Sequence, residues 1–174
     1  MGRGPEGSTV MPKPAQTPAL RPMLPADAAM LAAIYRASVE DLTAEDYDED
    51  QRNAWAALAA DEARFGEKLG ALLTLVATVA GAPAAFASLK GNDRIDMVYV
   101  YPALARQGLG TLLVDALEKL ARARGASSVS VDASDTARAF FERRGYKAQS
   151  RNSVPVSGEW LANTTLELRF EATR

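Results

Sequence analysis

The amino-acid sequence predicts a mixed α/β domain in which helices flank a mostly antiparallel central sheet. Three observations support this fold class. Residues 26–70 show helical periodicity, residues 72–101 alternate like strands joined by short turns, and a glycine turn then joins a strand directly to an amphipathic helix. The expected order of elements is β-α-α-β-β-β-α-β-α-β-β.

The N-terminal half begins with a short extended segment at residues 20–23, followed by two helices. Pro25 is suited to the first turn of a helix, which we expect over residues 26–38. Asp48 can cap a second helix that ends at Gly70, with a break expected at Ala60-Asp61. The apolar residues of each helix share one face: Met30, Leu31, Ile34 and Tyr35 in the first, and Trp55, Leu58, Phe65 and Leu69 in the second.

Three strands follow at residues 72–80, 84–90 and 94–101. Turn sequences separate them, Gly81-Ala82-Pro83 and Gly91-Asn92-Asp93, so an antiparallel meander is expected.

The last third of the chain alternates helices and strands. The clearest helix runs from the turn at Gly110 to Gly125 and has leucine and alanine at core spacing. A strand at 127–132, a helix at 136–144 and two strands at 146–154 and 160–170 complete the predicted domain.

Residues 1–19 are expected to form a disordered arm outside the domain of residues 20–174. Glycine and proline crowd this segment, and it has almost no apolar side chain to bury.

The composition excludes several kinds of chemistry. The 174 residues include no histidine and no cysteine, which excludes a Ser-His-Asp triad, a cysteine nucleophile and Cys/His metal sites. We expect no metal. The net charge of −2 gives no general attraction to nucleic acid or an anionic membrane, so we expect neither partner. With no apolar signal core at the N-terminus, the expected location is the cytoplasm.

Gly108 and Gly110 lie where a strand ends and a helix begins. Unpaired backbone N–H groups and the positive end of the helix dipole can together bind a phosphate at such a place. Two glycines also serve simply to permit a tight turn. No Lys-Ser/Thr pair follows, as in a P-loop, and no third glycine completes a dinucleotide fingerprint.

Two stretches carry a resemblance to a known family: residues 98–111 (VYVYPALARQGLGT) and residues 134–146 (SDTARAFFERRGY). Both resemble the GCN5-related N-acetyltransferase (GNAT) superfamily, and most of all its small bacterial acetyltransferases. The resemblance implies a sheet that is splayed between the strands at 94–101 and 127–132, with acetyl-CoA in the gap as co-substrate. It implies cofactor contacts from Val98, Tyr99, Val100, Arg106, Gln107, Gly108, Leu109, Gly110, Thr111, Ser134, Ala137, Phe140 and Phe141.

The sequence departs from the family pattern at three of its positions. Ala105 stands where the family has Arg or Gln before the glycines. Ser134 and Phe141 stand where the family usually has Asn and a tyrosine acid. A coenzyme A thiol resembles cysteine, with a pKa of about 8.5, so the thiolate can leave without full protonation.

Two residues are candidates for moving the proton of the acceptor amine. Asp132 lies near the end of a strand that borders the expected gap, although an aspartate there can equally cap the next turn. Tyr99 lies on the cofactor-facing strand, where an aromatic residue is also typical of a core. Tyr47, Trp55 and Trp160 are candidate walls for the acceptor, or ordinary packing residues.

The resulting hypothesis is an N-acetyltransferase that moves an acetyl group from acetyl-CoA to an amine of a small molecule or peptide. The amine attacks directly in a ternary complex, because without cysteine no thioester can form on the enzyme. The alternatives are a non-catalytic acyl-CoA-binding sensor or interaction module, and an acetyltransferase for protein lysines or N-termini. The sequence leaves open whether the protein is a monomer or a homodimer.

Overall fold

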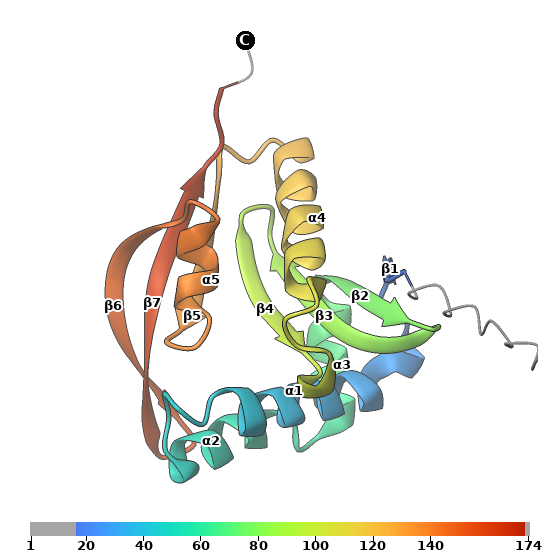
Figure 1. Ribbon diagram of the computed structural model, residues 1–174, viewed down its shortest axis with the longest axis vertical. Coiled ribbons are helices and arrows are strands. Elements are labelled where there is room, and N and C mark those ends of the chain that lie inside the picture. The colour runs from blue at the N-terminus through green and yellow to red at the C-terminus, as the bar shows by residue number, and fades with distance from the viewer. Residues whose placement is uncertain (1–16, 173–174) are drawn as a thin grey trace, which may run out of the picture.

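The computed structural model describes residues 17–172, and the order of its elements follows the predicted one (Figure 1). The predicted second helix is divided at a 3-10 turn into two helices, because Asp61 caps a new one by accepting a hydrogen bond from Arg64 N–H. The elements are β1 (Ala19–Pro22), α1 (Ala28–Leu42), α2 (Glu49–Ala56), α3 (Glu62–Gly70), β2 (Leu73–Val79), β3 (Ala82–Lys90), β4 (Arg94–Val100), α4 (Leu109–Ala123), β5 (Ser128–Ser134), α5 (Arg138–Arg143), β6 (Lys147–Val156) and β7 (Glu159–Arg169).

The N-terminal boundary differs slightly from the prediction. Residues 1–16 of the expected arm lie outside the described residues, and Ala19 already belongs to β1. Arg21 holds this end of the chain by donating two hydrogen bonds, of 2.7 and 2.8 Å, to the carboxylate of Asp27. The hydrogen bonds from Arg21 lower the pKa of Asp27, which is 8% exposed.

The seven strands form one sheet in the order β1-β2-β3-β4-β5-β7-β6, which confirms the mixed, mostly antiparallel prediction. Every neighbouring pair is antiparallel except β4 and β5. These two parallel strands pair only at Arg94 with Ser130 and at Ile95 with Val131, and then diverge (Figure 1). The edge of β4 beyond Ile95 therefore lacks a neighbouring strand.

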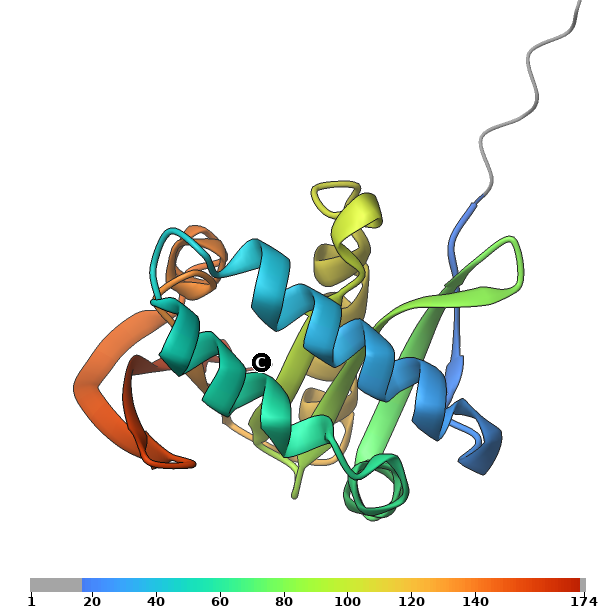
Figure 2. The ribbon, with the colours of Figure 1, turned by 90° about the horizontal axis from the view of Figure 1, so that it is seen from below.

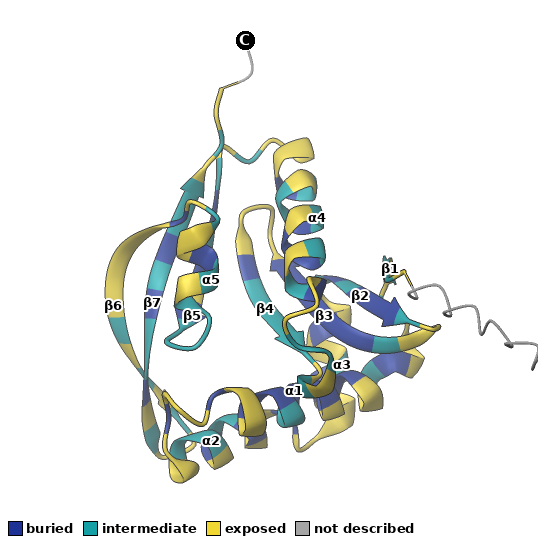
Figure 3. Cartoon of the chain, in the orientation of Figure 1, coloured by how far each residue is buried: buried dark blue, intermediate teal, exposed yellow. Residues whose placement is uncertain are grey.

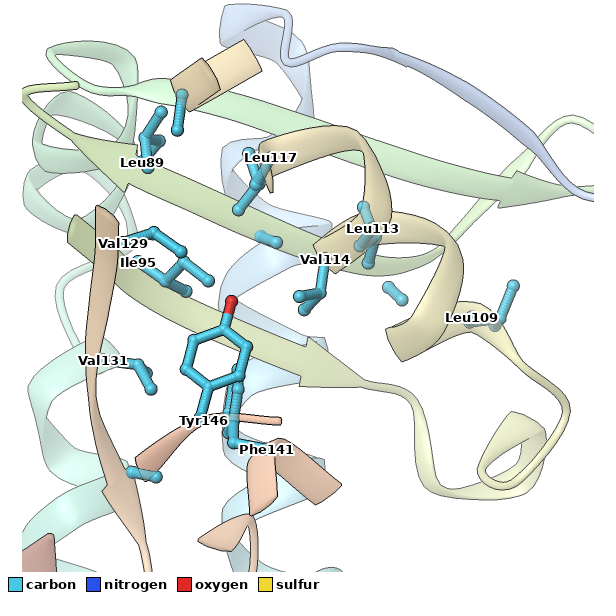
Figure 4. Packing of buried hydrophobic residues seen from close by; sticks show 14 of the residues in the cluster. Leu89, Ile95, Leu109, Leu113, Val114, Leu117, Val129, Val131, Phe141 and Tyr146 are labelled. Atoms are coloured by element: carbon cyan, nitrogen blue, oxygen red, sulfur yellow. The ribbon is translucent and has the colours of Figure 1, made fainter. Parts of the chain in front are cut away.

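Helices cover both faces of the sheet and build two apolar clusters. On one face α1, α2 and α3 pack over β2, β3 and β4 around Tyr35 and Phe86 (Figure 2). On the other face α4 places Leu113, Val114 and Leu117 over the strands (Figure 4). Buried positions run along most of β3 and alternate with exposed ones along the helices (Figure 3). None of the helices in residues 17–172 is long and apolar enough to cross a membrane.

A polar network joins α4 to the chain after α5. Arg144 pairs with Asp115 and Glu118, each at 2.6 Å, and the Tyr146 hydroxyl donates to Glu118 at 2.9 Å. The ring of Tyr146 lies beside Phe141, and its hydroxyl points toward α4 (Figure 4). Because α4 follows β4 and Tyr146 follows β5, this network ties together the two halves of the divided sheet.

Candidate active site

A cavity of about 660 Å³ opens where β4 and β5 diverge. Its walls come from β4, the loop before α4, β5, α5, α1, α2 and the β6–β7 hairpin. A cavity of this size suits a small molecule or part of a cofactor. The divergence of two strands thus brings together segments from across the chain.

The N-terminus of α4 forms one end of the cavity. Gly108 is the N-cap with φ +85°, and the first helical hydrogen bond runs from Leu112 N–H to Gly108 O at 3.0 Å. No side chain among residues 17–172 caps this helix, so the backbone N–H groups of Leu109, Gly110 and Thr111 precede the helical ladder. Such an end attracts an anion.

The loop before α4 is open and sharply turned. A Cβ at Gly108 would meet no other atom within 4 Å, and a Cβ at Gly110 would lie 3.8 Å from the ring of Phe140. Arg106 is also left-handed, with φ +62°, which is uncommon for a residue other than glycine. The backbone in this loop is therefore accessible to a bulky anionic group.

The free edge of β4 forms the long side of the cavity. Val98, Tyr99 and Val100 all line it, as the sequence predicts. On the other side β4 pairs with β3, from Lys90–Arg94 to Ala85–Val100. An extended chain could therefore pair with the unpaired edge as an added strand does.

Asp96 lies at a bulge in β4. Ser88 is paired with Met97 and Leu89 with Ile95, which leaves Asp96 as the extra residue. Asp96 is among the residues that line the cavity, and its Oδ2 is shielded from solvent and has no hydrogen-bond partner among the described residues. Oδ2 forms a long ion pair with Lys68 of α3, whose Nζ lies 3.9 Å away and whose side chain is 58% exposed.

Asp132 lines the same cavity, but its two oxygens are engaged. Oδ1 accepts a hydrogen bond of 2.6 Å from Thr165 on β7, and Oδ2 pairs with Arg94 on β4. This arrangement holds β5 between its neighbours at the narrow end of the gap. Of the two aspartates that line the cavity, Asp96 is thus the one whose Oδ2 accepts no hydrogen bond among the described residues, its one ion pair being the long contact with Lys68.

Tyr99 lies between the cavity and the apolar cluster of α1. Its ring is 4.6 Å from that of Tyr35, whose hydroxyl donates to Trp55 O at 3.1 Å. Burial raises the pKa of both tyrosines, and the Asp96 carboxylate adds a smaller upward effect. Tyr99 therefore keeps its proton at neutral pH.

Tyr47 joins the loop between α1 and α2 to the far half of the sheet. Its hydroxyl donates to Ala162 O at 2.6 Å and accepts from Asp135 N–H at 2.9 Å. The last β5–β7 pair is Ser134 with Asn163, so Asp135 and Ala162 would form the next one. The tyrosine hydroxyl bridges these two strands where they separate, and its ring lines the cavity beside Trp55.

Most of the residues predicted for the site come together. Arg106, Gly108, Leu109, Gly110 and Thr111 line the cavity, as do Ser134, Ala137, Phe140 and Phe141 from the far side. Two predicted residues are not part of its lining. Gln107 is exposed in the loop before α4. Trp160 is 63% exposed at the start of β7, which corrects its predicted place in an acceptor wall.

Comparison with known proteins gives the family. Residues 43–168 match the family model described as an acetyltransferase (GNAT) domain. The chain belongs to the GNAT family. It is an acetyl-CoA-dependent acetyltransferase, so of the two classes that the sequence left open, the enzyme is the one supported.

Individual GNAT relatives agree with this assignment. The chain is 34% identical over 144 residues to "Uncharacterized N-acetyltransferase YafP" of Escherichia coli, covering 83% of this chain and 91% of the relative. A solved structure described as a GCN5-related N-acetyltransferase, "Aminotransferase, Class-II", from Rhodopseudomonas palustris is 57% identical. It has a TM-score of 0.87, covering 94% of this chain and all (100%) of that one.

A more distant GNAT structure shares the fold. It is a putative acetyltransferase, yncA from Salmonella typhimurium, described with its cofactor acetyl-CoA, and it is 22% identical with a TM-score of 0.61. The match covers 91% of this chain and 96% of that one.

Proposed function

We propose that this GNAT enzyme transfers the acetyl group of acetyl-CoA to an amine of a small molecule or peptide by direct attack. One observation carries the proposal: a single cavity is lined by an uncapped helix N-terminus, an unpaired strand edge and Asp96, whose Oδ2 accepts no hydrogen bond among residues 17–172. These are respectively suited to a phosphate, an extended amide chain and an amine.

The residues present fit acetyl-CoA, which supplies an acetyl group activated as a thioester. The N–H groups of Leu109, Gly110 and Thr111 would hold the pyrophosphate, where no Cβ at Gly108 or Gly110 obstructs the backbone. The free edge at Val98–Val100 would pair with the amide-containing arm. Ser134, Ala137 and Phe140 would contact the cofactor from the opposite side of the gap.

Acetyl transfer to an amine requires a group that accepts the proton lost by the amine nitrogen. A new N–C bond forms as the C–S bond breaks, the sulfur leaves as a thiolate, and the amine nitrogen loses a proton. Asp96 is suited to accept that proton because Oδ2 has no competing hydrogen bond among residues 17–172. Tyr99, which burial keeps neutral, can donate a hydrogen bond beside it. Asp132 is a poorer acceptor, because both of its oxygens accept hydrogen bonds, from Arg94 and Thr165, whereas Asp96 has only the 3.9 Å ion pair with Lys68.

The reaction needs no covalent enzyme intermediate. The chain contains no cysteine, so acetyl transfer through an enzyme thiol is excluded. The cavity has walls from both halves of the sheet, which gives acetyl-CoA and the acceptor room to bind together.

Calorimetric titration with acetyl-CoA, followed by thiol-release assays with amines, tests the proposal. We expect saturable binding of acetyl-CoA and amine-dependent release of coenzyme A. Asp96→Asn should lower kcat by about 10²–10⁴-fold, the usual contribution of a positioned acid or base, with little change in acetyl-CoA affinity. Asp132→Asn is the matched control and should retain kcat within a few-fold.

Two results would overturn the proposal. Folded protein that fails to bind acetyl-CoA would remove the cofactor site. Equal losses of kcat in the two asparagine variants would remove the role assigned to Asp96.

A further inference from the structure

The two ends of the cavity differ in charge. The loop before α4 and helix α5 bring Arg106 and Arg143 to the end proposed for the cofactor. At the opposite end, α1, α2, the turn after α2 and the β6–β7 hairpin contribute mainly apolar and aromatic side chains. They include Leu42, Tyr47, Trp55, Leu58 and Leu161.

Three rings give this apolar end a defined surface. Trp55 lies edge-on to Tyr47 at 5.3 Å and to Tyr99 at 6.4 Å, with interplanar angles of 75° and 71°. The Tyr47 hydroxyl is held by two backbone groups, and the Trp55 carbonyl accepts a hydrogen bond from Tyr35. The rings are therefore fixed before any ligand binds, which lowers the entropy cost of packing against a flat apolar group.

The charges near this surface exclude an anionic group. Among the described residues, no lysine or arginine lines this end of the cavity, and Asp96 is the carboxylate beside it. Lys68 is near Asp96 but does not line the cavity, and Arg94 is paired with Asp132. A carboxylate on the acceptor would lose water, find no cation and be repelled by Asp96.

We propose that the acceptor is a primary amine on a compact apolar body, aromatic or branched aliphatic, with no carboxylate or phosphate near the amine. The apolar body packs on Tyr47, Trp55 and Tyr99, and the amine faces Asp96. This inference rests on the proposed acetyl transfer, because it names the substrate class of the same site.

Direct binding can be measured through Trp55. The chain has two tryptophans, so a Trp160→Phe background leaves Trp55 as the only one to report on the cavity. The probes are 2-phenylethylamine, phenylalaninol and phenylalanine, titrated by tryptophan fluorescence with and without coenzyme A. Phenylalaninol and phenylalanine share the same aromatic body and amine, but phenylalaninol has a hydroxymethyl group where phenylalanine has a carboxylate.

We expect the first two probes to bind with dissociation constants within a few-fold of each other and phenylalanine to bind at least about tenfold more weakly. Equal binding of phenylalanine and phenylalaninol, or no binding of any probe in either condition, would overturn the inference. Tighter binding of Nα-acetyl-lysine methylamide than of 2-phenylethylamine would also overturn it, in favour of a protein lysine.

A reversal variant tests the charge argument. Leu58 lines the cavity and is 55% exposed, so Leu58→Arg adds a cation there without opening the core. In Leu58→Arg, the ratio of the dissociation constant of phenylalanine to that of phenylalaninol should fall by about three- to fivefold, the effect of a partly exposed ion pair. Leu24→Arg is the matched control, because Leu24 is 54% exposed and outside the cavity lining. An unchanged preference in Leu58→Arg would contradict the inference.

Coenzyme A release, measured in parallel, separates this inference from the proposed function. If the probes bind in the expected order but release no coenzyme A, the acetyl transfer fails and the binding preference stands. If carboxylate-bearing amines release coenzyme A faster than apolar ones do, the transfer stands and the inference fails.

Discussion

Tyr47→Phe removes one hydroxyl group from the junction between the two halves of the sheet. That hydroxyl is the partner of both Ala162 O and Asp135 N–H, at 2.6 and 2.9 Å, and Tyr47 is 5% exposed. Leaving a buried polar group unpaired costs about 1–3 kcal/mol. Tyr47→Phe leaves two such groups, Ala162 O and Asp135 N–H, and both hydrogen bonds are only partly buried. We therefore expect a total loss of about 2–4 kcal/mol in the free energy of unfolding.

Thermal and urea unfolding measure this loss directly. For a chain of this size, each kcal/mol corresponds to about 2–4 °C in Tm, so Tm should fall by roughly 5–15 °C. Tyr101→Phe makes the same chemical change at a tyrosine that is 45% exposed and should leave Tm nearly unchanged. Tyr47 also lines the cavity at the end proposed for the acceptor, so KM for the amine should rise more than KM for acetyl-CoA.

A loss in Tyr47→Phe no larger than that in Tyr101→Phe would refute the bridging role. Unchanged acceptor KM together with the expected loss of stability would limit that role to the fold.

Four further predictions concern stability, each measured by urea unfolding. Gly110→Ala should stabilise the protein by about 0.5–1 kcal/mol, because Gly is a poor helix former and the new Cβ would be 3.8 Å from the nearest atom. Gly108→Ala should destabilise it by about 1–2 kcal/mol because of its φ of +85°; equal effects of the two changes would contradict this reasoning. Tyr146→Phe should cost about 1.5–3 kcal/mol, the value of a hydrogen bond to a charged group, here Glu118, and a neutral effect would refute it. Arg21 lowers the pKa of Asp27, so the stability from this pair is present above the unfolded-state pKa of about 3.9 and is lost as pH falls through the folded-state pKa. Asp27→Asn should therefore flatten the acid limb of the plot of unfolding free energy against pH. An unchanged acid limb would exclude the pair as the cause of that limb.

Local patterns in the sequence were sufficient for most of the elements. Asp48 caps α2 by accepting from Gln51 N–H at 2.8 Å, and Gly108 precedes α4, both as predicted. These features depend on residues within one turn of each other, so their spacing in the sequence contains the information.

The candidate catalytic residues were harder to predict. Strict alternation along β4 gives no reason to single out Asp96, because its position depends on a bulge that is defined by pairing with β3. A carboxylate four residues before the end of a strand is the only signal that could have drawn attention to it. The sequence places Asp132 on a strand that borders the expected gap and leaves its role open, because its contacts with Arg94 and Thr165 come from two other strands.

The order of the elements, the glycine turn at the start of α4 and the absence of cysteine and histidine chemistry follow from the amino-acid sequence alone. The tertiary structure alone decided which side chains meet in the cavity: Tyr47 enters it from the loop after α1, and Trp160 remains outside. The physical reason is the range of the interactions. Capping, turns and periodicity act within a few residues, whereas the divergence of β4 from β5 depends on strand pairing across the whole sheet.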